Sequence, residues 1–378
     1  MNVRFVFGAS PSYEQALSSC LHLSKSSFVR LSIQQYWAFP LAQLICAMRS
    51  RSYLWITRES AVKPDVVWFL DLPDQKESFN ESLARSAVSV LQIAESPRKK
   101  SFEWSAYISS QFNYVLNYSS VASSNSDIKY RLPFSSYVDN GVFLDLPVFS
   151  DRRHCCLINT KRDPTLNMRL SAVYQQYRSR VANEEWSPCI WPAGLLKSKT
   201  DDLFSIDDFV SFASNNKLMS FDLYGRGWDR TNGKLGFLPS RKPPACLVSD
   251  HDFYSSGLGA KFDILMKYRF SIICENTSGD FDYVSEKIFD SLIAGCIPLY
   301  AGDNKFADRH DGEILFSLRR FDRFSDLEAF IVGFDYGKWL KMSQKCIDFA
   351  MHSCYSQRNR CDDFVNTALS LLDSLASG

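Results

Sequence analysis

The sequence lacks an apolar run of the kind that spans a membrane. Its longest uncharged stretch, residues 31–48, contains three glutamines and one proline, all costly in a lipid core. We therefore expect this stretch to be buried inside the protein. The N-terminal residues also lack the long apolar segment of a secretion signal, so the sequence predicts a cytoplasmic location.

An excess of charge is lacking too, as are the usual metal-binding patterns. Forty-three basic residues against 42 acidic ones give a formal net charge of +1, which gives no reason to expect a nucleic-acid partner. The eleven cysteines contain no CxxC pair, and the five histidines form no HxH or HExxH pattern. Reduced, mostly buried thiols are the simplest interpretation of these cysteines, and no metal site is predicted from their spacing.

The 378 residues, 46% hydrophobic and 22% charged, are typical of a globular protein with about two domains. In the first half, short β-branched or aromatic runs alternate with helical patterns, which predicts an α/β domain with a parallel sheet. A stretch rich in Ser, Asn, Asp and Pro at 119–152 predicts loops and a linker, and places the domain boundary near residue 150. The expected strands are 3–7, 66–70, 88–94 and 114–118.

The second half repeats the α/β pattern. A strand at 155–159 precedes a helix that begins at Asp163 and Pro164, which suit its N-cap and first position. Two such halves are expected to face each other across a ligand cleft. The further expected strands are 221–224, 270–274 and 297–300, and the further expected helices are 285–294, 326–332, 336–352 and 364–375. The predicted organisation is a domain at 1–150, a second at 151–345 and a helical tail at 346–378.

The densest polar cluster, residues 275–287, lies between a predicted buried strand and a helix start. Parallel α/β sheets bind ligands at this end of their strands. A helix N-terminus together with Lys287 would hold a phosphate well. The alternative is that Glu286 and Lys287 only solvate the first helical turn. Asp280 and Asp282 form a DxD triplet, a weak pattern from which we expect no metal site.

The segment 268–302 resembles the signature of the α-1,3-fucosyltransferases, glycosyltransferase family 10. About thirty residues agree in order and spacing, and Arg269 stands where lysine is usual. The matching positions are Tyr268 and Phe270, Glu275 and Asn276, Tyr283, Glu286 and Lys287, Ala294 and Gly295, and Pro298.

The resemblance extends upstream in order, so that it covers about residues 85–305. It includes Glu95-Ser96-Pro97, Phe112-Asn113-Tyr114, Leu132-Pro133-Phe134, the strand and helix at 157–178, and the turn at 221–227. Glu95 takes the place of the family's catalytic base. The family's phosphate-binding arginine falls most naturally on Arg169, with Arg162 as the competing choice.

The resemblance implies two facing Rossmann-like domains (the GT-B fold) and an inverting transfer of L-fucose from GDP-β-L-fucose to a glycan hydroxyl. It implies an acceptor-binding first domain, a donor-binding second domain, and no essential metal or other cofactor. Arg169 and Lys287 would stabilise the diphosphate, and Glu286 would accept from the ribose hydroxyls. Asn276, Tyr283 and Arg226 are further donor-binding candidates, whereas Glu275 is expected only to hold the loop.

Two alternatives stay open: the same fold with another nucleotide-sugar donor, and a non-catalytic glycan-binding protein. The expected acceptor is an oligosaccharide or a lipid-linked glycan such as a lipopolysaccharide precursor. Basic groups at 98–100 and 319–323, with an amphipathic C-terminal helix, suggest peripheral contact with an anionic inner membrane, although such patches are more often solvated surface. The segment 229–256 is interpreted as a lid over the acceptor or donor.

Overall fold

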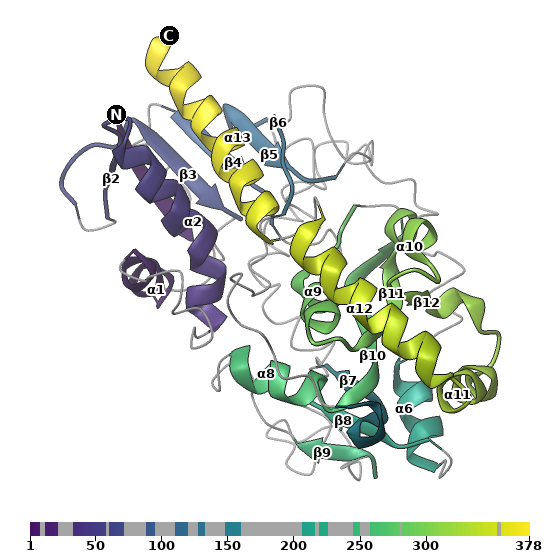
Figure 1. The fold of residues 1–378 in the computed structure, drawn as a ribbon. Coiled ribbons are helices and arrows are strands. Elements are labelled where there is room, and N and C mark those ends of the chain that lie inside the picture. Colours follow the sequence, from purple (N-terminus) through teal and green to yellow (C-terminus); the bar gives the residue numbers. More distant parts are fainter. Residues whose placement is uncertain are drawn as a thin grey trace, which may run out of the picture.

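The computed structural model contains two parallel β-sheets of six strands each, with helices packed around them (Figure 1). The described residues are 1–7, 12–21, 33–57, 60–71, 88–94, 110–119, 128–132, 148–159, 206–215, 219–225, 245–249, 258–279, 282–353 and 357–378. Within them, no helix is long and apolar enough to cross a membrane. All nine cysteines in these ranges are free thiols.

The first sheet has the strand order β2-β1-β3-β4-β5-β6. The four strands expected in this half are confirmed, and the two-residue strands β2 and β6 were not predicted. The strands are β1 (Asn2–Phe7), β2 (Leu54–Trp55), β3 (Val66–Leu70), β4 (Val88–Gln92), β5 (Tyr114–Asn117) and β6 (Ile128–Lys129). The helices are α1 (Ser12–Cys20) and α2 (Ile33–Arg49). The uncharged stretch at 31–48 thus forms most of α2, whose residues Leu41, Ala42, Leu44 and Ile45 are buried as expected.

The second sheet has the order β12-β11-β10-β7-β8-β9. Read from β9, this is the order 3-2-1-4-5-6 of dinucleotide-binding domains, with its topological switch point between β7 and β10. The strands are β7 (Arg153–Ile158), β8 (Phe221–Tyr224), β9 (Leu247–Ser249), β10 (Tyr268–Gly279), β11 (Ile297–Asp303) and β12 (Phe316–Ser317). The expected end of β10 at Cys274 is wrong, because its pairing with β11 resumes at Gly279 and Asp303 after a register shift.

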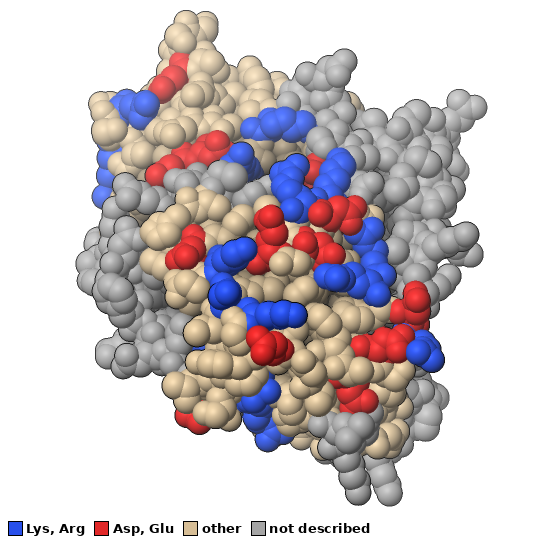
Figure 2. Space-filling view, turned by 45° about the vertical axis from the view of Figure 1, so that its right-hand side comes forward, with Lys and Arg blue, Asp and Glu red and all other residues tan. Residues whose placement is uncertain are grey.

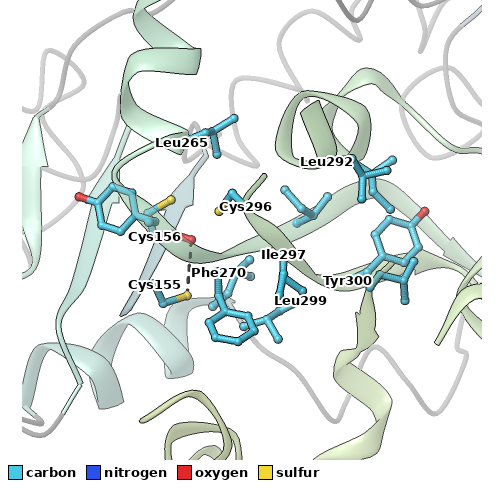
Figure 3. Close-up of a cluster of buried hydrophobic side chains, with 14 of the residues drawn as sticks. Cys155, Cys156, Leu265, Phe270, Leu292, Cys296, Ile297, Leu299 and Tyr300 are labelled. Carbon is cyan, nitrogen blue, oxygen red and sulfur yellow. Dashed lines mark hydrogen bonds between the residues drawn. The ribbon is translucent and has the colours of Figure 1, made fainter. Parts of the chain in front are cut away.

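Seven helices accompany the second half of the described chain. They are α6 (Ile206–Asn215), α8 (Leu258–Leu265), α9 (Glu286–Ile293), α10 (Asn304–His310), α11 (Phe324–Val332), α12 (Tyr336–His352) and α13 (Gln357–Ser377), with short 3₁₀ turns at Phe149–Asp151 and Leu318–Arg320. Apolar side chains of β7, β10 and β11 meet those of α8 and α9 in the core of this domain (Figure 3). Cys155, Cys156 and Cys296 are completely buried there. The expected helices at 285–294, 326–332, 336–352 and 364–375 are confirmed as α9, α11, α12 and α13.

The helix α13 returns from the second domain to the first, where it lies beside α2 (Figure 1). Its residues Phe364, Ala368 and Leu372 are completely buried in the hydrophobic core of the first domain. Asp373 accepts hydrogen bonds from Arg51 Nε at 3.0 Å and from Tyr53 Oη at 2.8 Å. The segment expected to be a tail, 346–378, therefore contains the end of α12, which packs in the second domain, and α13, which packs in the first domain from Phe364 onward.

Candidate functional site

A small pocket lies at the switch point of the second sheet. Lys261 from α8 and Lys287 from α9 line it, together with Leu157–Asn159 at the carboxyl end of β7 and Ser271–Cys274 in the middle of β10. Its volume of about 20 Å³ admits roughly one water-sized group. It can therefore take an oxygen of a ligand, such as a phosphate oxygen, but not a whole nucleotide.

The start of α9 is built by three residues of the predicted polar cluster. Ser285 caps the helix, as its sequence position predicts, with its Oγ accepting from the Lys287 N–H at 3.3 Å. The carboxylate of Glu275 accepts from the Ser285 N–H at 2.8 Å and from the Ser285 hydroxyl at 2.5 Å. The end of β10 thereby fixes the N-terminus of α9, which gives Glu275 the loop-holding contacts expected of it.

Two contacts with β10 hold Lys287 at the edge of the pocket. Its Nζ donates to the carbonyl oxygen of Cys274 at 3.2 Å and lies 3.7 Å from Oε2 of Glu275. Burial raises the pKa of the Glu275 carboxyl above its usual value, although the neighbouring Lys287 ammonium and the Ser285 hydrogen bonds act in the opposite direction. The Lys287 side chain keeps 26% of its surface exposed, so a ligand can reach it.

Lys261, the second cation of this pocket, was not singled out by the sequence. Its Nζ contacts Oδ2 of Asp290 at 2.5 Å, and Asp290 is completely buried on α9. Burial raises the pKa of the Asp290 carboxyl to about 6, although Lys261 acts in the opposite direction. The two residues are far apart in sequence and α8 was not predicted, so no local pattern could have brought them together.

A larger pocket of about 240 Å³ lies between the two domains. It occurs where the carboxyl ends of β5 and β6 face the carboxyl end of β11 and the helix α10, so the predicted interdomain cleft is present. Its lining residues are Tyr118, Tyr130, Arg131, Leu132, Asp282, Val284, Asp303, Lys305, Phe306 and Arg309. On one face of the molecule, acidic and basic side chains gather in a band across the middle (Figure 2).

One acidic residue of this larger pocket, Asp303, accepts hydrogen bonds from backbone N–H groups. Asp303 caps α10 through a 2.8 Å bond from the Phe306 N–H, and its other oxygen accepts from the Asp282 N–H at 2.7 Å. Asp282 has a positive φ of 58°, and its Oδ1 lies 4.0 Å from Nζ of Lys305. Asp280, the partner of Asp282 in the DxD triplet, lies outside the described residues. Within the described ranges, no group of three or more His, Cys, Asp or Glu side chains could hold a metal ion.

Tyr283 links the loop before α9 to the first domain. It is only 3% exposed, and its ring packs against that of Tyr118 with a centroid distance of 5.8 Å. Tyr283 belongs to the hydrophobic core of the first domain. The two domains are therefore in contact directly beside the start of α9. The donor-binding role of Tyr283 stays a prediction.

The structure brings Glu286 and Lys287 together at the N-terminus of α9, with Glu286 half-buried. Asn276 is part of β10, where only its backbone is described. Three predicted phosphate- or donor-binding residues lie outside the described residues: Arg162, Arg169 and Arg226. Of the segment 229–256, which is interpreted from the sequence as a lid, only 245–249 is described. Their predicted roles stay predictions.

Glu95 is also outside the described residues, but the strand that leads to it is held firmly. The Ala94 N–H donates to Oδ1 of Asp71 at 2.7 Å, and the carbonyl oxygen of Ile93 accepts from the hydroxyl of Tyr130 at 2.6 Å. Sequence reasoning missed Asp71 and Tyr130, because neither lies within 20 residues of these contacts.

Two six-stranded parallel sheets, joined by a returning C-terminal helix and facing each other across a cleft, define the GT-B fold, as predicted. Among solved structures, the DNA-modifying enzyme β-glucosyltransferase, studied with and without its substrate uridine diphosphoglucose, matches 97% of this chain and 99% of its own. Its TM-score is 0.50 at 9% sequence identity.

Two structures of α1,3-fucosyltransferase are also similar. One covers 97% of this chain and 90% of its own, with a TM-score of 0.45 and 12% identity. The other, with GDP, covers 91% and 81%, with a TM-score of 0.43 and 12% identity. No protein-family model matches the sequence, and no curated protein matches it.

Proposed function

We propose that the protein is an inverting glycosyltransferase that transfers L-fucose from GDP-β-L-fucose to a hydroxyl of a glycan acceptor. The observation that carries this proposal is the position of Lys287 at the capped start of α9, beside the switch point of a GT-B fold. That segment is also the one whose sequence resembles the fucosyltransferase signature. The second domain would bind the donor and the first domain the acceptor.

The chemistry requires a stabilised leaving group. As the bond to fucose breaks, the departing GDP gains negative charge on its diphosphate, and cations aimed at that charge lower the barrier. Lys287 and the partial positive charge at the start of α9 would do so without a metal ion, assisted by Arg169 and Arg226. Glu286 would accept from the ribose hydroxyls, and Asn276 and Tyr283 would contact the donor.

The chemistry also requires a base, because a sugar hydroxyl is a poor nucleophile at neutral pH. Glu95 would take the proton from the attacking hydroxyl. In the sequence it stands three residues after the end of β4, and β4 belongs to the sheet whose neighbouring strands β5 and β6 lead to the interdomain pocket. A cytoplasmic enzyme of this kind would act on an oligosaccharide or on a lipid-linked glycan at the inner membrane.

A second candidate function is the same transfer from a different nucleotide sugar. The described part of the site presents charges suited to a diphosphate, and its geometry does not distinguish one hexose from another. The structural likeness to the β-glucosyltransferase, which takes uridine diphosphoglucose, favours keeping this candidate. A non-catalytic glycan-binding protein on the same fold is the remaining alternative.

Calorimetric titration of the full chain with GDP-fucose, GDP-mannose, GDP and UDP-glucose in EDTA tests these functions. We expect GDP and GDP-fucose to bind, and Lys287→Ala to weaken both, whereas Lys341→Ala, an exposed lysine on α12, leaves binding unchanged. Preference for UDP-glucose or GDP-mannose supports the second candidate. Absence of binding to all four contradicts the transferase proposal.

A further inference from the structure

Lys261 and Lys287 reach one small pocket from two different helices. Lys261 comes from α8, which leads directly into β10, and Lys287 comes from α9, which follows β10. The other described residues that line the pocket include no charged side chain. Two ammonium groups therefore border a space of about 20 Å³ at the switch point, the place where parallel α/β sheets bind nucleotide phosphates.

The contact between Lys261 and Asp290 places a charged carboxylate inside the fold. Asp290 is completely buried, and its Oδ1 has no hydrogen-bond partner among the described residues, while Oδ2 contacts the ammonium group of Lys261. A buried ion pair often contributes less stability than apolar side chains of similar volume, because both charges lose their hydration. What the pair does supply is a lysine whose ammonium group is fixed in position at the edge of the pocket.

The exposure of the two side chains fits this arrangement. The Asp290 side chain is 1% exposed, whereas that of Lys261 is 19% exposed. The carboxylate thus lies behind the lysine, on the side away from solvent. A ligand that enters the pocket meets Lys261 and Lys287 and is kept away from the negative charge of Asp290.

We propose that Lys261 binds the donor diphosphate together with Lys287, and that Asp290 positions its ammonium group for this contact. This inference rests on the proposed function, since it assigns a further residue to the same donor site. An ammonium group is a compact point charge, so two of them on separate helices suit the oxygens of a diphosphate. The pocket has room for one such oxygen, while the base and the sugar lie outside it.

The test uses the full chain with Lys261→Met and three probes: GDP, UDP and inorganic pyrophosphate. Calorimetric titration in EDTA should give dissociation constants about 10- to 100-fold weaker than those of the wild type for each bound probe. Lys267→Met is the matched control, because Lys267 is exposed at the opposite, amino end of β10. It should bind all probes as the wild type does.

A second variant separates phosphate binding from a purely structural role. Lys261→Met leaves Asp290 buried without its cation and is expected to lower the urea midpoint of unfolding. The double variant Lys261→Met/Asp290→Leu removes both charges and should restore much of that midpoint, but not the affinity for pyrophosphate. If affinity returns together with stability, Lys261 serves only to neutralise Asp290, and the inference is overturned.

The failure of this inference can be distinguished from that of the proposed function. If the wild type binds none of the three probes, both are contradicted. If the wild type binds GDP and Lys287→Ala weakens binding while Lys261→Met does not, only the role of Lys261 is overturned.

Discussion

The carboxylate of Asp71 accepts a hydrogen bond from the backbone N–H of Ala94, so the end of β3 holds the residue directly before Glu95. Asp71 itself has a positive φ of 53°, a conformation that is strained for a non-glycine residue. The bond therefore fixes the point where β4 ends and the segment with the predicted base begins.

Replacing Asp71 with alanine should lower turnover more than it lowers donor affinity. Loss of the bond to Ala94 would displace the proposed base, and a displacement of about 1 Å can cost on the order of 100-fold in rate. Steady-state measurement of kcat and of KM for the donor checks this. Asn113→Ala is the control, since Asn113 Oδ1 accepts from the Ser89 N–H at 2.8 Å at the other end of the same strand. Equal losses of kcat in both variants would contradict a specific role for Asp71.

Replacing Gly302 with alanine should disturb the hydrogen bonds between Glu275 and Ser285 at the start of α9. A Cβ atom there would lie 2.3 Å from Oη of Tyr300 and 2.6 Å from Cγ of Glu275, so one or both of these side chains must shift. We expect a loss of about 1–3 kcal/mol in the free energy of unfolding and weaker nucleotide binding. Urea denaturation and calorimetric titration measure the two effects.

Gly312→Ala provides the comparison for the Gly302 variant. Gly312 has a φ of 81°, and no atom of the described residues lies within 4 Å of an added Cβ, so alanine strains the backbone without a collision with them. It should cost about 1–2 kcal/mol of stability with nucleotide affinity unchanged. Loss of affinity in this variant as well would mean that binding follows overall stability and not the position of Glu275.

Asp290 should make stability depend on pH. Burial raises its pKa from 3.8 to about 6, so between these values the folded state binds more protons than the unfolded state. The free energy of unfolding should therefore fall by about 3 kcal/mol as the pH rises from about 4 to 6, and stay at the lower level above that. Urea denaturation at several pH values should show this fall in the wild type and not in Asp290→Asn. Parallel pH curves for the two proteins would exclude the expected shift.

Two substitutions of Tyr283 separate packing from donor binding. Tyr283→Ala removes the ring contact with Tyr118 and should cost about 3–5 kcal/mol of stability, whereas Tyr283→Phe keeps the ring. If the hydroxyl contacts the donor, as the resemblance implies, Tyr283→Phe should weaken GDP-fucose binding with little change in the melting temperature. Unchanged affinity in a stable Tyr283→Phe protein would restrict Tyr283 to packing between the domains.

Local features of the site could be predicted from the sequence. Ser285 caps α9, and Gly295 ends it with a φ of 61°, because capping and left-handed stops depend on a few neighbouring residues. The two-residue strands β2, β6 and β12 are too short to leave an alternating pattern. The short helix α8 could not be predicted either, since packing and not intrinsic propensity stabilises helices of this length.

Contacts between distant segments could not be predicted in the same way. Lys261 with Asp290, Asp71 with Ala94, and Tyr118 with Tyr283 depend on how the strands are ordered in space. The extension of β10 to Gly279 was also missed, because Glu275, Asn276 and the residues after them are polar and read as a loop. Pairing with β11 resumes beyond them, at Gly279 and Asp303, so the strand continues despite their composition.

The return of α13 to the first domain has a consequence for biosynthesis. The strands of the first domain's sheet emerge early from the ribosome. Its core is completed by Phe364 and Leu372, and these two residues follow the whole second domain in the sequence. The second domain can thus acquire its full set of core residues while the first still exposes apolar surface to solvent. Folding on the ribosome should then run against the usual order from the N-terminus, and chaperone binding during synthesis should concentrate on the half that emerges first.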